Sequence, residues 1–195
     1  MIEARKLGRT FGAKRVIHEL DLDVARGDFL LVTGPNGSGK TTLLRLVAGL
    51  LVPTAGELRV GTSRDRVGFL GHEPLVYREL TALENLDLYG RLYRVPERRE
   101  RIGMLLERFG LWAARNQRAD SFSRGMLQRL ALCRTLLHDP DLLVLDEPFS
   151  ALDDEGAALL DGELADLRPR ATFLVATHDP ERLAPLATGR LAFTA

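Results

Sequence analysis

The sequence predicts an α/β protein with a parallel sheet, an antiparallel β region and an inserted α-helical arm. A glycine-rich loop, residues 34–41, stands between an apolar run and a segment of helical periodicity. Two later runs, 142–145 and 172–176, are the continuous apolar stretches of core strands. Between them and the loop, the pattern from Thr81 to about residue 137 is helical.

Composition bounds the organisation and the class of the protein. At 195 residues the chain suits one core, so we expect a single domain over 1–195 with an α-helical subdomain at about 73–137. The formal net charge is +0, so nucleic acid is not expected as a partner. The single cysteine, Cys133, stands among apolar residues, which favours a packed thiol over a reactive one.

The sequence shows no signal peptide, and no apolar run approaches the roughly 18 residues of a membrane span. We therefore expect a cytoplasmic protein that reaches a membrane only through a partner.

The first elements are expected to be strands. Apolar residues from Val16 to Val24 alternate with acidic ones, which predicts an antiparallel strand with one wet face. A turn at 26–28 leads to a buried strand at 29–32. Phe11, beside a glycine, falls in an apparent loop, and its spacing alone favours an aromatic at the edge of the core.

The glycine-rich loop matches the phosphate-binding pattern G-x-x-x-x-G-K-[ST], in the required order of strand, loop and helix. Glycines let backbone N–H groups turn toward a phosphate, and the following helix, expected at 42–50, adds its dipole. Lys40 supplies a charge for the outer phosphates, and the Thr41 hydroxyl suits Mg²⁺. The residues expected around the phosphates are Gly34, Pro35, Asn36, Gly37, Ser38, Gly39, Lys40, Thr41 and Thr42.

Short strands at 57–60 and 67–70 precede the helical arm. Thr81 and Glu84 form a capping box at the start of its first helix. A second helix is expected between Pro96 and Gly110, and a third over about 125–137. The basic cluster Arg98, Arg99 and Arg101 is typical of a solvated helix face.

Two carboxylates follow the buried run 142–145, at the strand end where open α/β sheets bind ligands. Adjacent strand residues point to opposite faces, so they should do different work. We expect Asp146 to hold Mg²⁺ through water and Glu147 to take a proton from the attacking water. Taken alone, the pair could also be the start of a loop.

His178 follows the strand 172–176 at the same edge of the sheet. A single histidine is often structural, but this placement favours a role in orienting the γ-phosphate or the water.

The segment Ser121-Phe122-Ser123-Arg124-Gly125-Met126-Leu127-Gln128-Arg129 resembles the signature of ABC proteins, and the chain resembles ATP-binding subunits of ABC transporters over nearly its full length. The resemblance implies an ATPase that uses ATP and Mg²⁺, with His178 as its switch histidine and Phe11 stacked on adenine. It implies a head-to-tail dimer, expected to be a homodimer, in which Ser123 and Gly125 face the γ-phosphate held by the other subunit. Residues 150–153 resemble the family's D-loop.

The chain departs from the family pattern at three positions. Arg124 replaces the usual glycine of the signature, and Met126 replaces its glutamine. His72 stands where the family has a glutamine that contacts Mg²⁺ and the membrane partner. The resemblance therefore places His72 near the metal, although an imidazole is not the same hard oxygen donor.

The stretches 68–72 and 80–86 are similar to the ATP-binding subunit of the haem exporter of cytochrome c maturation, whose chains are also short. The resemblance implies a peripheral protein on the inner face of the cell membrane that powers a permease through the surface near 72–94. Three alternatives stay open: an ABC ATPase for another cargo, a non-transport ABC ATPase acting on DNA or ribosomes, and a nucleotide-binding regulator without hydrolysis.

Overall fold

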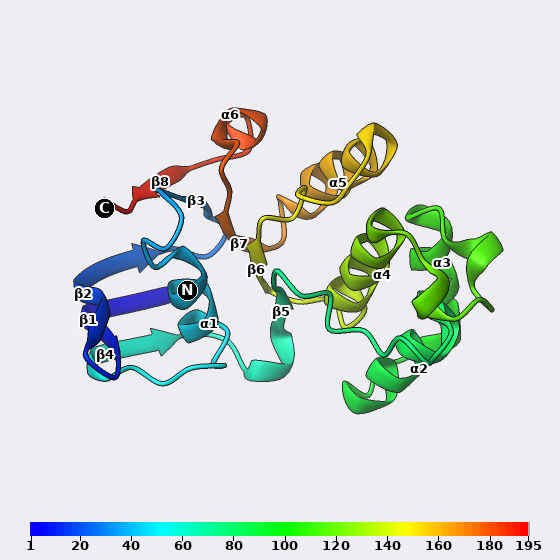
Figure 1. Ribbon diagram of the computed structural model, residues 1–195, viewed down its shortest axis with the longest axis horizontal. Coiled ribbons are helices and arrows are strands. Elements are labelled where there is room, and N and C mark those ends of the chain that lie inside the picture. The colour runs from blue at the N-terminus through cyan, green and yellow to red at the C-terminus, as the bar shows by residue number, and fades with distance from the viewer. Residues whose placement is uncertain (195) are drawn as a thin grey trace. The chain divides into compact units, whose positions relative to one another are not determined.

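The computed structural model describes residues 1–194, which form two compact units (Figure 1). The first unit comprises Met1–Phe69, Asp141–Glu147 and the segment from Leu167 onward. The second comprises Leu70–Pro140 and Pro148–Asp166, and the helical arm predicted at about 73–137 falls within its first segment.

The first unit contains the parallel strands. They are β3 (Phe29–Thr33), β6 (Leu142–Asp146), β7 (Thr172–Ala176) and β8 (Gly189–Ala192), and β5 (Val67–Leu70) stands at one edge. The strand order is β5-β6-β7-β3-β8. Every residue of β6 and β7 is buried, which confirms that these continuous apolar runs are core strands. Because the strands are parallel, the carboxyl ends of β3, β6 and β7 meet at one edge.

A three-stranded antiparallel sheet has the order β2-β1-β4, formed by β1 (Ile2–Phe11), β2 (Lys14–Val24) and β4 (Ala55–Val60). The prediction that Phe11 lies in a loop is wrong, because Phe11 is the last residue of β1 and pairs with Lys14. The alternation predicted for β2 is interrupted at Glu19, whose φ is 43°. This bulge allows Ile17 and Leu22 to be buried together despite their odd spacing.

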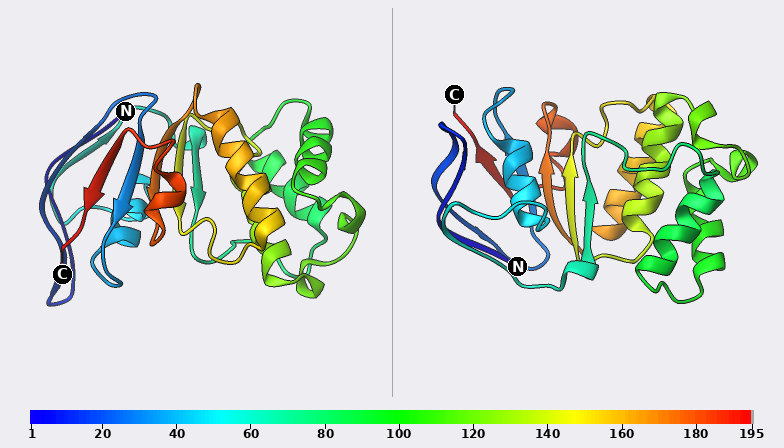
Figure 2. Two further views of the ribbon diagram at one scale, coloured as in Figure 1. Left: turned by 90° about the horizontal axis from the view of Figure 1, so that it is seen from above. Right: turned by 60° about the horizontal axis from the view of Figure 1, so that its bottom comes forward.

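Helix α1 (Lys40–Val47) begins and ends slightly earlier than predicted. Its apolar side chains join one cluster with residues of β1 and β2 and with one face of β3, β6 and β7. Figure 2 shows α1 between the antiparallel strands and the parallel ones. This packing fixes the start of α1 at the carboxyl end of β3. A short helix, α6 (Pro180–Leu183), follows β7.

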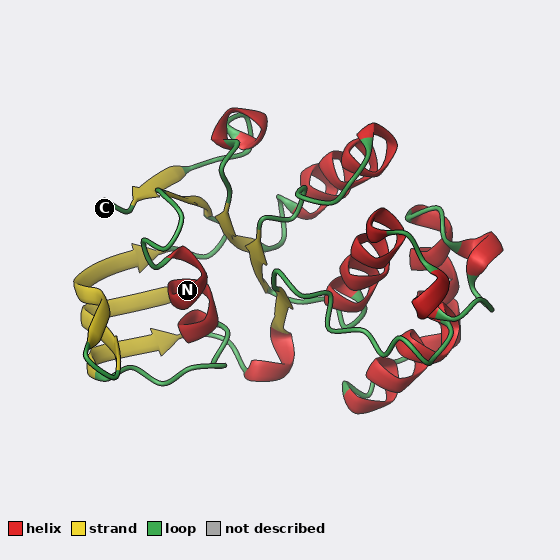
Figure 3. Ribbon diagram, in the orientation of Figure 1, coloured by secondary structure: helices red, strands yellow, loops and turns green. Residues whose placement is uncertain are grey.

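The second unit is helical, apart from the end of β5 (Figure 3). Its helices are α2 (Ala82–Leu92), α3 (Arg98–Arg108), α4 (Arg124–Leu136) and α5 (Asp154–Leu167). The capping box is confirmed: the Glu84 N–H donates to Thr81 Oγ1 at 3.1 Å, and the Thr81 N–H donates to Glu84 Oε2 at 2.8 Å. Among residues 1–194, none of the helices has the length and apolarity that crossing a membrane requires.

The basic cluster on α3 is less solvated than predicted. Arg98 bonds to Asp87 at 2.6 Å and thereby lowers the pKa of that carboxyl group, and Arg101 donates to the Leu136 carbonyl at 3.0 Å. Of these three arginines, only Arg99 is exposed. The Cys133 thiol is packed as predicted, and burial raises its pKa.

An ion pair joins α3 to α5. Arg108 Nη1 lies 2.6 Å from Glu163 Oε2, and the Glu163 side chain is only 3% exposed. Removing Arg108 leaves a buried charge without its partner. We expect Arg108→Ala to lower the free energy of unfolding by about 2 kcal/mol. The melting temperature should then fall by about 4–8 °C.

Arg99→Ala is the control, because Arg99 is an exposed arginine of the same helix. Replacing Glu163 with leucine in the Arg108→Ala background removes the buried charge and should recover stability. An equal melting temperature for the two arginine variants would show that the pair contributes nothing.

Candidate active site

The phosphate loop joins β3 to α1 in the first unit. Gly34 and Gly39 have φ values of 141° and 112°, which residues other than glycine rarely adopt. Gly39 is the N-cap of α1 and provides no side-chain cap, and the first turn of α1 has no acidic residue. The N–H groups at the start of this helix therefore keep their capacity to bind an anion.

Lys40 is a buried cation, only 8% exposed. Its Nζ donates to the carbonyl oxygens of Gly34 at 2.7 Å and Pro35 at 3.1 Å. Within residues 1–194 no carboxylate pairs with it. The Ser38 hydroxyl is buried and has no hydrogen-bond partner in the described part of the chain. A buried cation without a carboxylate partner and a buried hydroxyl without a hydrogen bond both fit a phosphate ligand.

Thr41 and Asp146 meet beside the loop. The Thr41 hydroxyl donates to Asp146 Oδ2 at 2.7 Å, and Asp146 is only 3% exposed. A hydroxyl and a carboxylate are the hard oxygen donors that suit Mg²⁺, which commonly takes only one or two carboxylates from a protein. In the described residues there is no cluster of three or more His, Cys, Asp or Glu for a metal. The donors present therefore fit Mg²⁺ bound together with a phosphate.

Glu147 and His178 meet where β6 and β7 end. His178 Nδ1 lies 2.6 Å from Glu147 Oε2, and the His178 backbone N–H donates to the same oxygen at 3.3 Å. Glu147 has a φ of 50°, a strained conformation that for a residue other than glycine costs about 1–3 kcal/mol. Asp146 and Glu147 thus take different partners, but not for the reason predicted, because β6 ends at Asp146 and Glu147 has a left-handed backbone in place of a strand position.

Phe11 is 43% exposed, and one face of its ring is covered. The guanidinium carbon of Arg9 lies 4.5 Å from the ring centroid, and Arg9 Nη1 also donates to the Val52 carbonyl at 2.8 Å. An adenine stacked on Phe11 would use the other face. The sequence analysis missed this contact because it placed Phe11 in a loop, whereas residues two apart in a strand share one face of the sheet.

The signature segment lies at the start of α4 in the second unit. Ser123 is the N-cap, is exposed, and accepts a hydrogen bond on Oγ from the Met126 N–H at 3.2 Å. The first turn of α4 has no acidic residue, as in α1. A Cβ added to Gly125 would lie 3.2 Å from the Ala151 carbonyl oxygen, so the backbone of Ala151 approaches the signature closely.

The predicted site residues therefore divide between the units. Lys40, Thr41, Asp146, Glu147 and His178 belong to the first unit, as do Phe11 and the phosphate loop. Ser123, Gly125 and the exposed His72 belong to the second.

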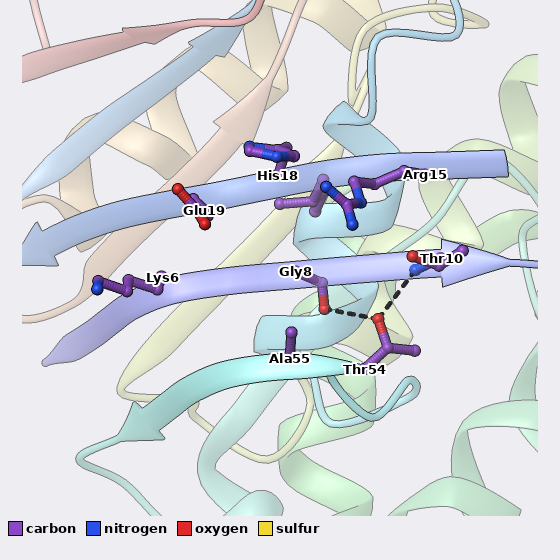
Figure 4. Close-up of a pocket in the computed structure, with 9 residues that line it drawn as sticks. Lys6, Gly8, Thr10, Arg15, His18, Glu19, Thr54 and Ala55 are labelled. Atoms are coloured by element: carbon purple, nitrogen blue, oxygen red, sulfur yellow. Dashed lines mark hydrogen bonds between the residues drawn. The ribbon is translucent and has the colours of Figure 1, made fainter.

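A hollow of about 210 Å³ opens on the antiparallel sheet (Figure 4). Thr54 Oγ1 donates to the Gly8 carbonyl and accepts from the Thr10 N–H at its rim. None of the predicted site residues lines it, so we assign it no part in the active site.

Comparisons with known proteins agree with this geometry. Residues 17–150 match the family model described as "ABC transporter". The chain is 42% identical over 180 residues to the cytochrome c biogenesis ATP-binding export protein CcmA of Pseudomonas syringae pv. tomato, covering 87% of this chain and 84% of that protein. It is 34% identical over 203 residues to the ABC transporter ATP-binding protein NatA of Bacillus subtilis, covering 95% and 82%.

Other relatives are longer. The uncharacterized ABC transporter ATP-binding protein YxlF of Bacillus subtilis is 36% identical over 184 residues, which cover 91% of this chain but 62% of that protein. Among solved structures, the ATP-binding cassette MJ0796 in a dimeric, post-hydrolysis state bound to ADP and Pi has a TM-score of 0.89 at 26% identity, covering 99% of this chain and 94% of that one.

The phosphate loop, the Thr41–Asp146 and Glu147–His178 pairs and the α4 signature are thus found on the fold of solved ATP-binding cassettes. The chain belongs to the ABC transporter family, whose ATP-binding cassettes are ATPases.

Proposed function

We propose that this chain is the ATP-binding and ATP-hydrolysing subunit of a haem exporter of the cytochrome c maturation type, where it powers a membrane permease. The observation that carries the choice of cargo is the 42% identity to CcmA over 84% of that protein's length. Relatives with other roles, including a Nod factor export protein at 35% identity, make another cargo the alternative.

We propose that the protein binds ATP both at its phosphates and at its adenine. The phosphates lie in the loop, residues 34–42, against Lys40 and the start of α1, and the adenine stacks on the face of Phe11 that Arg9 leaves open. Thr41 and Asp146 hold Mg²⁺, which neutralises charge on the phosphates. His72 is assigned to the metal by the family position alone, and its exposure leaves its ring available.

We propose that Glu147 is the general base and that His178 orients it. The 2.6 Å contact to His178 Nδ1 restrains the carboxylate at Oε2, which leaves the second oxygen to take a proton from the attacking water. The strained backbone at Glu147 supports a functional reason for its position.

We propose that a second copy of the chain completes each site. Ser123 and Gly125 at the start of α4 face the γ-phosphate bound by the partner's loop, because a helix N-terminus with no acidic residue in its first turn attracts an anion. Hydrolysis converts ATP and water into ADP and phosphate, and release of that phosphate then removes the shared ligand and reopens the dimer. The dimeric state of a solved cassette supports this arrangement.

We propose that the permease docks on the second unit, near residues 72–94, so that the subunit works as a peripheral protein on the cytoplasmic face of the membrane. Four large apolar side chains in this range are exposed, namely Leu75, Tyr77, Leu83 and Leu92. Exposed large apolar side chains are the residue type from which interaction sites are built.

The test is a capture experiment with the Glu147→Gln variant, which should hold ATP without hydrolysing it. Tagged protein with ATP and Mg²⁺ is incubated with detergent-solubilised native membranes, and the bound chains are identified. A small polytopic permease with haem or cytochrome c assembly factors supports the proposal. Recovery of a different permease would support the transport role but rule out haem as the cargo. Recovery of ribosomes or nucleic acid alone would overturn the transport role.

Leu83→Asp serves as the control for the docking surface. Leu83 is 37% exposed and belongs to the second unit, whereas the phosphate loop and Glu147 belong to the first, so this variant should still hydrolyse ATP. It should fail to capture the permease. Undiminished capture would place the docking surface elsewhere.

A further inference from the structure

Phe193 follows β8 and lies against the phosphate loop. Its N–H donates to the Thr33 carbonyl at 2.8 Å, one residue before the loop begins. Arg190 Nε donates to the Thr33 hydroxyl at 2.9 Å, so β8 is tied to the end of β3 through both backbone and side chain. These bonds set the position of Phe193 relative to Gly34.

The backbone of Phe193 closes on the first glycine of the loop. A Cβ added to Gly34 would lie 2.6 Å from the Phe193 carbonyl oxygen and 2.9 Å from its Cβ. Both distances are shorter than side-chain atoms tolerate, so Gly34 is packed directly against Phe193.

The ring of Phe193 reaches the other end of the loop. A Cβ added to Gly39 would lie 3.4 Å from Phe193 Cε1. Val16 of β2 approaches the same point, with its carbonyl oxygen at 3.1 Å and Cγ1 at 3.3 Å. Gly39, which immediately precedes Lys40, is therefore packed between Val16 and the ring of Phe193.

We propose that Phe193 is a positioning residue for ATP binding. By contacting Gly34 with its backbone and Gly39 with its ring, it fixes the two ends of the loop relative to each other. The start of α1 and the Lys40 ammonium are then aimed at the phosphates before ATP arrives, which lowers the ordering cost of binding. This inference rests on ATP binding at the loop and is independent of the transported cargo.

The first test is the Phe193→Ala variant, assayed for ATP hydrolysis over a range of ATP concentrations. We expect KM to rise about tenfold, equivalent to one charge-assisted hydrogen bond. The rate at saturating ATP should stay within about twofold, because Glu147 and His178 are untouched. Phe193→Tyr keeps the ring and should restore the wild-type KM.

Two further variants separate positioning from stability. Leu191→Ala removes a partly buried side chain of the same strand that packs on the same apolar cluster, but Leu191 makes none of these close approaches to the loop glycines. It should lower the melting temperature and leave KM unchanged. Phe193→Leu preserves apolar bulk without the ring edge, so it should also raise KM and provides the test should the alanine variant not fold.

An unchanged KM in Phe193→Leu, or an equal rise in Leu191→Ala, overturns the inference. The wild-type protein is measured in the same assay. If it hydrolyses ATP, the ATPase assignment stands even where the inference about Phe193 fails.

Discussion

Replacing Glu147 with glutamine is expected to lower the ATP hydrolysis rate by about 10²- to 10⁴-fold, the usual contribution of a general base. Glutamine keeps the size of the side chain and can still bond to His178, but it cannot accept a proton from water at neutral pH. ATP affinity should be retained, because Lys40, Thr41 and the loop are unchanged. The measurement pairs steady-state phosphate release with ATP titration of the same preparation.

The control for this variant is Glu181→Gln, an exposed glutamate on α6 of the same unit, which should hydrolyse ATP at the wild-type rate. Hydrolysis near the wild-type rate in Glu147→Gln would remove Glu147 as the base. The short contact between Glu147 and His178 would then serve only to hold the two side chains in place.

Replacing Lys40 with alanine is expected to weaken ATP binding by about 10- to 100-fold, as loss of a hydrogen bond to a charged group predicts. The ammonium is buried and, within residues 1–194, bonded only to loop carbonyls, so a phosphate is the partner that compensates its charge. Isothermal titration with ATP measures the effect.

Lys14→Ala is the matched control, because Lys14 is an exposed lysine at the start of β2. It should bind ATP with the wild-type affinity. An unchanged titration of Lys40→Ala would refute the phosphate role of this side chain.

The parts of the site that sequence predicted are those whose chemistry demands particular residue types. A phosphate loop needs glycines followed by lysine and a hydroxyl, and the sequence has them in a strand-loop-helix context. Continuous apolar runs placed Asp146 and Glu147 at a strand end, since parallel core strands leave few polar positions. The structure adds their separate partners, Thr41 and His178.

The parts that sequence did not predict depend on contacts between distant segments. Nothing in the residues around Phe193 indicates that it lies against Gly34, because that contact arises from the pairing of β8 with β3. The left-handed backbone of Glu147 is likewise set by its surroundings and not by glutamate's own preferences.

Two local features also escaped prediction. Helix α5 contains Gly156 and Gly162, which weaken helix propensity, and its place depends on packing such as the Arg108–Glu163 pair. The bulge at Glu19 changes which residues of β2 are buried, and a strict alternation cannot reveal it.

The measurement that tests the central claim most directly is the mass of the Glu147→Gln protein in solution with ATP and Mg²⁺. Sedimentation of this variant should show a monomer of 21.6 kDa without nucleotide and a species of twice that mass with ATP. Adding Ser123→Arg, which places a bulky side chain at the start of α4, should abolish the dimer while ATP still binds. A monomer fully saturated with ATP would contradict the account, because no second copy would then complete the site.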